Sequence, residues 1–104
     1  MERIGFAMKV LPGRVDEYRA RHAAVWPDML AALKDAGCRN YSIFLRGDDL
    51  FGYLEVDDLA RFRATLAASP VNDRWQAEMT ALTDPLTDPD TGFHQQLEEV
   101  FHLD

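Results

Sequence analysis

The sequence predicts a small α+β domain in which helices cover one face of an antiparallel sheet. The chain has 104 residues, which is enough for one domain, and we take 1–104 as that domain. Its apolar residues follow period two near the start and helical periods directly afterwards. Segments with strand and helix character then occur in the order β-α-β-β-α-β. This order is typical of a ferredoxin-like sandwich.

The first third of the chain predicts one strand and a helical region with a break. Residues 3–11 alternate, and one face of this strand carries Ile4, Phe6, Met8 and Val10. After the strand, a helical stripe carries Val15, Tyr18, His22 and Val25. Pro27 disfavours the α conformation in Trp26 and suits the first position of a helix, so we expect a second short helix there. Gly37 is a natural end for it.

The middle of the chain predicts a hairpin followed by further helices. Residues 40–45 (NYSIFL) and 50–56 (LFGYLEV) are rich in aromatic and β-branched residues, and only four residues join them. An apolar stripe over residues 59–66 predicts the next helix. The pair Ser69-Pro70 predicts the N-cap and first residue of another.

The last fifth of the chain predicts a loop and a closing strand. Residues 84–92 (DPLTDPDTG) contain two prolines and several Asp and Thr residues, which is typical of a loop. We expect residues 97–103 (LEEVFHL) to form the final strand of the sheet. The open face of such a sheet is apolar enough to need cover. A second copy of the chain would provide it, so we expect a homodimer.

Composition excludes several classes of function. The balance of 11 Lys and Arg against 18 Asp and Glu gives a net charge of -7, which argues against nucleic acid and anionic membranes as partners. The single cysteine, Cys38, cannot form an internal disulfide, and with three histidines it gives no spacing typical of a metal site. There is no apolar run long enough for a membrane span and no signal-peptide pattern. We therefore expect a cytoplasmic location.

The residues that could perform chemistry are few. The chain has no phosphate-binding, dinucleotide-binding, serine-hydrolase or zinc motif. His22 lies one helical turn after Tyr18, so their side chains share a face, and an imidazole exchanges protons near neutral pH. By themselves, however, a lone histidine and the tryptophans Trp26 and Trp75 are more often packing residues. A solvated position is the commoner explanation for the two remaining histidines, His94 and His102, and for the pair Glu98-Glu99, although a carboxylate near the site could serve as a base.

Longer segments of the sequence resemble the L-rhamnose mutarotase family. They are residues 18–28 (YRARHAAVWPD), 40–45, 50–55, Arg74-Trp75 and 97–103. These segments fall in the family's order and spacing, and the resemblance covers essentially the whole chain. It implies a dimeric ferredoxin-like fold and interconversion of the α and β anomers of a 6-deoxyhexose such as L-rhamnose. It implies neither a metal nor an organic cofactor.

The resemblance also implies a set of site residues. His22 matches the family's proposed proton donor, and Tyr18, Tyr41 and Trp75 match positions that line the sugar site. Where the family commonly has a second tryptophan, this chain has Gln76. An amide can hydrogen-bond a hydroxyl group but offers no stacking face. The resemblance implies L-rhamnose as the substrate. The departure at residue 76 makes L-fucose or another 6-deoxy sugar the alternative.

Mutarotation is compatible with so sparse a site. A proton must reach the ring oxygen and another must leave the anomeric hydroxyl, after which the carbonyl rotates and the ring closes. We expect protonated His22 to donate to the ring oxygen and to retrieve that proton on closure. Tyr18 and Tyr41 would hold sugar hydroxyls, and Trp75 would pack on an apolar patch that includes the C6 methyl. The base stays open between a tyrosine, a carboxylate and a water molecule.

Two other classes of function stay open. A small monooxygenase acting on haem or polycyclic substrates predicts an apolar cavity large enough for a flat ring system. Tyr18, His22 and Tyr41 around one small cleft would count against it. A non-catalytic binding module predicts that the substitution His22→Ala leaves ligand binding nearly unchanged.

Overall fold

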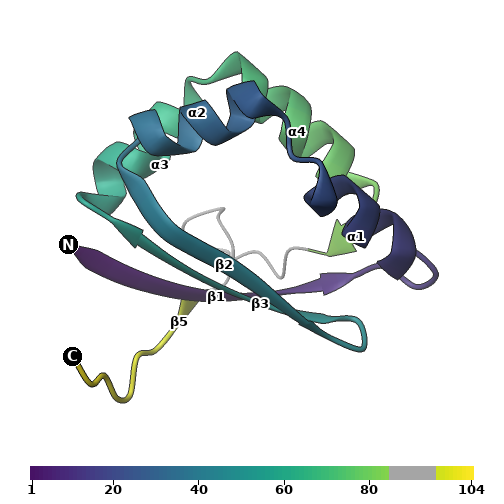
Figure 1. Cartoon of the computed structure of the whole chain (residues 1–104), viewed down its shortest axis with the longest axis horizontal. Coiled ribbons are helices and arrows are strands. Elements are labelled where there is room, and N and C mark those ends of the chain that lie inside the picture. The colour runs from purple at the N-terminus through teal and green to yellow at the C-terminus, as the bar shows by residue number, and fades with distance from the viewer. Residues whose placement is uncertain (85–95) are drawn as a thin grey trace.

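A computed structural model of the chain describes residues 1–84 and 96–104 and contains one antiparallel sheet with four helices. The elements in chain order are β1 (Glu2–Val10), α1 (Val15–Ala23), α2 (Pro27–Asp35), β2 (Cys38–Arg46), β3 (Asp49–Val56), α3 (Leu59–Ala67), α4 (Pro70–Thr80), β4 (Thr83–Asp84) and β5 (Gln96–Leu97). The strand order is β2-β3-β1-β4, and β5 also pairs with β1. All four helices lie on one side of the sheet (Figure 1), so the predicted α+β architecture is confirmed.

The predicted helix boundaries are confirmed where proline and serine mark them. Trp26 has an extended backbone (φ -58°, ψ 135°), and Pro27 is the first residue of α2. Ser69 is the N-cap of α4, and its Oγ accepts a hydrogen bond of 3.3 Å from the backbone N–H of Asn72. Gly37 follows α2 with a φ of +86°, a left-handed conformation that glycine adopts without strain.

The predicted closing strand is wrong over most of its length. Only Gln96 and Leu97 pair with β1, whereas residues 98–104 form no strand. Another part of the same β1 edge is taken by β4, which pairs with Lys9 and Val10. Val100, Phe101 and Leu103 therefore have no strand partner among the described residues. Apart from Asp84, which belongs to β4, the predicted loop 84–92 lies outside the described residues, as does His94.

The inner face of the sheet, which faces the helices, forms the core. Alternate residues of β1 are buried there, as predicted, and those of β3 join them. Gly52 of β3 pairs with Phe6 of β1, and a Cβ atom added to Gly52 would overlap the Phe6 ring. The absence of a side chain at Gly52 thus lets the Phe6 ring lie across β3. From there its edge faces the ring of Tyr41, with centroids 6.0 Å apart.

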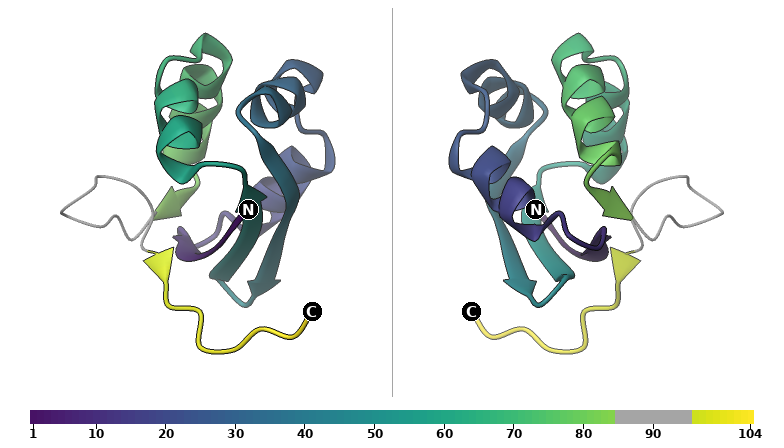
Figure 2. Two further views of the ribbon diagram at one scale, coloured as in Figure 1. Left: turned by 90° about the vertical axis from the view of Figure 1, so that its left-hand side faces the viewer. Right: turned by 90° about the vertical axis from the view of Figure 1, so that its right-hand side faces the viewer.

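None of the helices in residues 1–84 and 96–104 lies on the outer face of the sheet. Phe44 of β2 and Phe51 of β3 are exposed on this face, and Leu97 of β5 is exposed beside it. The terminal segment 98–104 runs below the sheet, on the side opposite the helices (Figure 2), with its apolar side chains 79–87% exposed. In the described part of the chain, no helix is long and apolar enough to cross a membrane.

Candidate functional site

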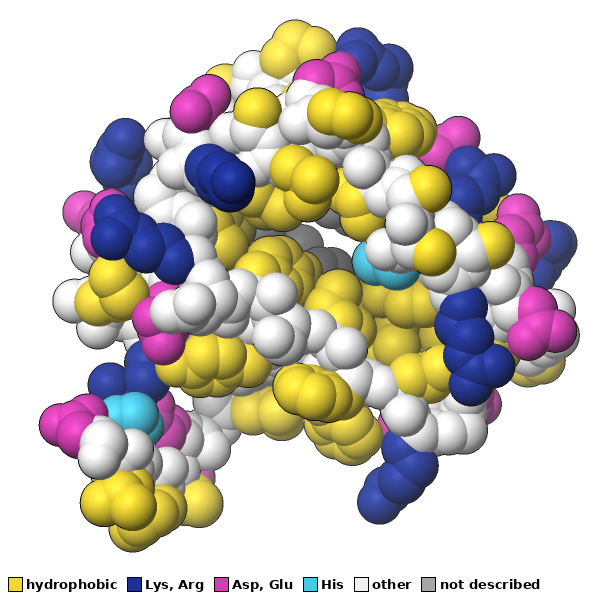
Figure 3. Space-filling model, viewed as in Figure 1, with side chains coloured by type: hydrophobic (Ala, Val, Ile, Leu, Met, Phe, Trp, Pro, Cys, Tyr) yellow, Lys and Arg dark blue, Asp and Glu magenta, His cyan; other side chains and the backbone are white. Residues whose placement is uncertain are grey.

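A cavity of about 670 Å³ separates the inner face of the sheet from the helices. Figure 3 shows it as a hollow between two layers, with hydrophobic side chains around it. A cleft of about 130 Å³ adjoins it and shares five lining residues: His22, Tyr41, Ile43, Trp75 and Gln76. Tyr18 completes the cleft. The five residues that the sequence predicted for the site are thus brought together where cleft and cavity meet.

The imidazole of His22 is held in one tautomer by the backbone of its own helix. Its Nδ1 lies 3.0 Å from the carbonyl oxygen of Tyr18, one turn earlier in α1. Because a carbonyl oxygen only accepts, Nδ1 carries the hydrogen and donates it. Nε2 has no hydrogen-bond partner among residues 1–84 and 96–104 and keeps its lone pair for a ligand.

Burial favours the uncharged form of this imidazole. Removal from water lowers the pKa of His22 from the ordinary value of 6.5, while the hydrogen bond to the Tyr18 carbonyl opposes that change to a smaller extent. The neutral ring is therefore the predominant form near pH 7. A neutral ring with a free Nε2 is a proton acceptor, which differs from the protonated donor expected from the sequence.

Aromatic rings fix the plane of the imidazole. Tyr18 stacks on His22 with centroids 4.1 Å apart and an interplanar angle of 24°. Trp75 of α4 meets the imidazole edge to face at 5.4 Å, and Trp26 supports Trp75 in the same way at 5.1 Å. Such contacts restrict rotation about the His22 side-chain bonds. Trp75 therefore contacts the histidine itself as well as lining the cavity.

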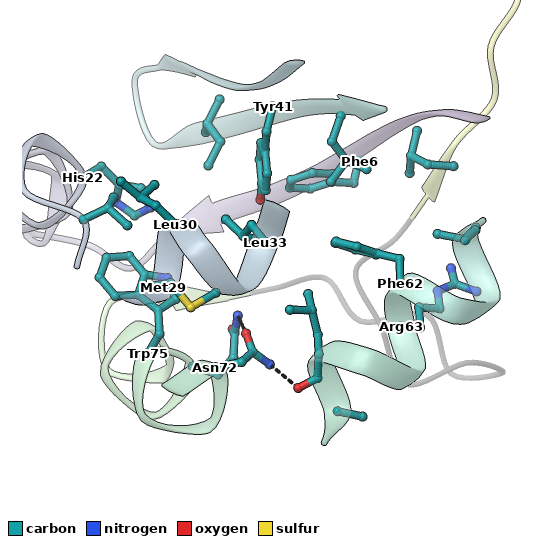
Figure 4. Close-up of a pocket in the computed structure, with 18 of the residues that line it drawn as sticks. Phe6, His22, Met29, Leu30, Leu33, Tyr41, Phe62, Arg63, Asn72 and Trp75 are labelled. Atoms are coloured by element: carbon teal, nitrogen blue, oxygen red, sulfur yellow. Dashed lines mark hydrogen bonds between the residues drawn. The ribbon is translucent and has the colours of Figure 1, made fainter. Parts of the chain in front are cut away.

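The two tyrosines supply uncharged O–H groups. The hydroxyl of Tyr18 is buried and has no hydrogen-bond partner in the described part of the chain, and burial raises the pKa of this phenol to about 12. Burial also raises the pKa of Tyr41, and its hydroxyl points into the cavity although the residue as a whole is 38% exposed (Figure 4). Both phenols are hydrogen-bond donors at any physiological pH.

A bulge in β2 turns Tyr41 inward. Cys38 faces the core, so strict alternation would direct Asn40 inward and Tyr41 outward. The pairing of β2 with β3 shifts between Arg39 and Ser42, and Asn40 takes a left-handed φ of +50°. The bulge reverses the alternation and places Tyr41 and Ile43 on the cavity side. No glycine occurs among residues 38–46 to signal this irregularity.

A pair of amides borders the cavity opposite the sheet. Gln76 Nε2 donates to Asn72 Oδ1 at 3.3 Å, and Asn72 Nδ2 donates to the carbonyl oxygen of Leu66 at 3.1 Å (Figure 4). Asn72 was not a candidate in the sequence analysis. Its distance of one helical turn from Gln76 is the signal that would have found it.

The other candidates lie away from the cavity. Glu99 pairs with Arg3 at 2.7 Å, and His102 pairs with Asp104 at 2.8 Å in the exposed terminal segment. Among the described residues, neither cavity nor cleft is lined by a carboxylate. In the same residues no three His, Cys, Asp or Glu side chains gather as a metal site would require. Among the described residues that line the site, His22 is therefore the one whose side-chain type has an unperturbed pKa near neutrality.

Comparison with known proteins places the chain in a family. The family model described as L-rhamnose mutarotase matches residues 3–103. L-rhamnose mutarotases from Oceanobacillus iheyensis and Ligilactobacillus salivarius are 41% and 44% identical, over 100% and 98% of this chain and 100% and 97% of theirs.

Solved structures agree with this placement. A crystal structure of an L-rhamnose mutarotase from Formosa agariphila is 31% identical, covers both chains completely and has a TM-score of 0.80. Tetracenomycin F2 cyclase from Streptomyces glaucescens is 16% identical, with a TM-score of 0.70 over 100% of this chain and 98% of that chain, and shares the fold alone. The chain therefore belongs to the L-rhamnose mutarotase family.

Proposed function

We propose that this protein is a mutarotase that interconverts the α and β anomers of L-rhamnose at the junction of cleft and cavity. The observation that carries the proposal is the grouping of one neutral imidazole, two neutral phenols and an indole around a single pocket. Membership of the family supplies the reaction class. L-Fucose and other 6-deoxy sugars stay alternatives because Gln76 stands where the family commonly has a second tryptophan.

The tautomer of His22 determines the order of the proton transfers. Nε2 accepts the proton of the anomeric hydroxyl as the bond between C1 and the ring oxygen breaks and the aldehyde forms. The imidazolium then gives this proton to the former ring oxygen, and the ring nitrogen is neutral again. Rotation about the C1–C2 bond and the reverse transfers close the other anomer. One group suffices because both oxygens are attached to the same carbon.

The phenols stabilise the charge that develops during ring opening. The ring oxygen gains negative charge before the proton arrives, and a neutral O–H that is already desolvated stabilises that charge well. Tyr18 is suited to this role because its buried hydroxyl is unpaired within the described residues. Tyr41 reaches the pocket from the sheet and holds another oxygen of the sugar. Trp75 offers an apolar surface for the C6 methyl group.

The apolar volume of the cavity also bears on the rival functions. Its size and lining fit a flat ring system, as a small monooxygenase would require. Against that reading, Tyr18, His22 and Tyr41 line one small cleft, and the family is one of mutarotases. Measuring anomer exchange together with sugar binding distinguishes a mutarotase from a non-catalytic binding module.

A homodimer is part of the proposal. Apolar side chains are exposed on the outer face of the sheet (Phe44 and Phe51) and in the terminal segment (Val100, Phe101 and Leu103), and exposed apolar patches often mark protein–protein contacts. A second copy that covers the outer face would leave the helix-side cavity open to substrate. The single cysteine, Cys38, and the absence of a membrane-length helix in the described residues are compatible with the proposed cytoplasmic location.

The test is saturation transfer in NMR between the anomeric protons of L-rhamnose, with L-fucose in parallel. The wild type is expected to speed the exchange, and His22→Ala to lower the rate by about 10²–10⁴-fold while sugar binding is retained. His102→Ala, in the exposed terminal segment, is the matched control and should be as active as the wild type. No acceleration by the wild type with either sugar would overturn the proposal. A binding module would bind sugar with no exchange in any variant.

A further inference from the structure

The amides of Asn72 and Gln76 form an ordered chain between the end of α3 and the cavity. The chain begins at the carbonyl oxygen of Leu66, which accepts from Asn72 Nδ2 at 3.1 Å. It continues to Asn72 Oδ1, which accepts from Gln76 Nε2 at 3.3 Å. Gln76 ends the chain at the point where cleft and cavity meet, since it lines both.

The chemistry of the first acceptor fixes the direction of both amides. A carbonyl oxygen has no hydrogen to donate, so the NH₂ group of Asn72 must face Leu66. The oxygen of Asn72 then faces Gln76 and requires the NH₂ group of Gln76 in return. Reversing either amide would set oxygen against oxygen or nitrogen against nitrogen. The orientation therefore follows from the backbone and does not depend on how amide atoms are assigned.

Asn72 is itself firmly anchored. It is 9% exposed and occupies the first turn of α4, where its backbone N–H donates to the N-cap oxygen of Ser69. Leu66, at the other end, lies in the last turn of α3, and its carbonyl also accepts from the backbone N–H of Ser69 at 3.0 Å. A side chain held at both ends is a rigid support for a neighbour one turn away.

We infer that Asn72 is a positioning residue that turns the Gln76 amide so that its oxygen, Oε1, faces the bound sugar. The inference rests on the proposed mutarotase function and deepens it. Gln76 Oε1 has no hydrogen-bond partner among the described residues and only accepts. The site thus favours a sugar with a hydroxyl donor at this point over one with hydrogen or an ether oxygen there. The selectivity acts on binding, because Gln76 does not move the proton.

A double-mutant cycle tests the coupling between the two amides. The variants are Asn72→Ala, Gln76→Ala and the double variant, with Asp73→Ala on the exposed side of α4 as the control. Anomer exchange of L-rhamnose is followed by NMR over a range of sugar concentrations, and thermal melting verifies folding. If Asn72→Ala melts below the assay temperature, Asn72→Leu keeps the side-chain volume and replaces it in the cycle.

The expected result is a rise in KM with little change in kcat. Gln76→Ala should raise KM by about tenfold, as for the loss of one neutral hydrogen bond. When Gln76 is present, Asn72→Ala should raise KM by about threefold, because Gln76 then samples other rotamers. In the Gln76→Ala variant, Asn72→Ala should leave KM unchanged.

Two outcomes would overturn the inference. One is an equal rise in KM from Asn72→Ala with and without Gln76, which describes a merely structural role for Asn72. The other is an unchanged KM in every variant, which removes Gln76 from the sugar site. Both leave the wild-type exchange and its dependence on His22 intact, so they are distinguishable from failure of the proposed function.

Discussion

The two faces of the sheet are built from the same strands but are completed in different ways. On the inner face, Phe6 and Leu54 are at most 5% exposed, and helices supply the rest of the site. On the outer face, Phe44 is 64% exposed, and none of the described helices covers this face (Figure 2). The helices of the same chain cover one face, and the proposed second copy would cover the other. Substitutions on the inner face should alter stability and catalysis, whereas those on the outer side should alter assembly.

The largest effect is expected at Gly52 on the inner face. Gly52→Ala places a methyl group within the Phe6 ring and should destabilise the fold by about 3 kcal/mol. Gly5→Ala is the matched control, because its Cβ would meet Leu97 at an ordinary 3.7 Å. Urea unfolding measures both free energies. Equal stability of the two variants would show that the Phe6 ring does not depend on Gly52.

The outer side is tested by a charge in the terminal segment. Phe101→Asp should weaken the proposed dimer by about 100-fold, since an exposed aromatic side chain that the dimer would bury is lost, and Phe101→Leu should weaken it much less. Sedimentation equilibrium measures the dissociation constant. A dimer unaffected by the aspartate would place the interface elsewhere, and a monomeric wild type would remove the dimer from the account.

Tyr18→Phe separates activity from stability on the inner face. Its buried hydroxyl has no partner in the described residues, so its removal should leave the free energy of unfolding unchanged or raise it by about 1 kcal/mol. The exchange rate should nevertheless fall by about tenfold, because the ring oxygen loses a donor. The control is Tyr53→Phe. The hydroxyl of Tyr53 lies away from the cavity and donates to Glu55 over a distance of 2.7 Å. Full activity of Tyr18→Phe would assign the donor role to Tyr41 instead.

The smallest effect is expected at the N-cap of α4. Ser69→Ala removes the oxygen that accepts from the Asn72 backbone and should cost about 1 kcal/mol of stability. Ser42→Ala, at an exposed position of β2, should cost less. Thermal melting of the two variants gives the difference, and equal melting temperatures would contradict a stabilising cap.

Local signals in the sequence predicted most of the fold. The alternation in residues 3–11, Pro27 and the pair Ser69-Pro70 each act through short-range physics, so the elements they predict were found. The closing strand 97–103 failed because the apolar character of this segment indicates only that its side chains need cover. It does not say whether the partner strand belongs to the same chain.

The five residues named from the sequence lie together in the structure, and their role in the site stays a prediction. His22 and Tyr18 share a helical stripe, and the family resemblance added Tyr41, Trp75 and Gln76. What depends on tertiary contacts was not accessible to the sequence: the bulge that turns Tyr41 inward and the burial of His22. Burial favours the neutral imidazole, and the order of proton transfers that we propose follows from that form.

The pH dependence of kcat/KM tests this order most directly. Burial lowers the pKa of His22 from 6.5, so the neutral base is present near pH 7 and is lost as the pH falls through that lowered pKa. After correction for the spontaneous reaction, kcat/KM for L-rhamnose should be level near neutrality and fall tenfold per pH unit at low pH, with its midpoint below 6.5. A value of kcat/KM that rises as the pH falls would instead make protonated His22 the initial donor and contradict the account.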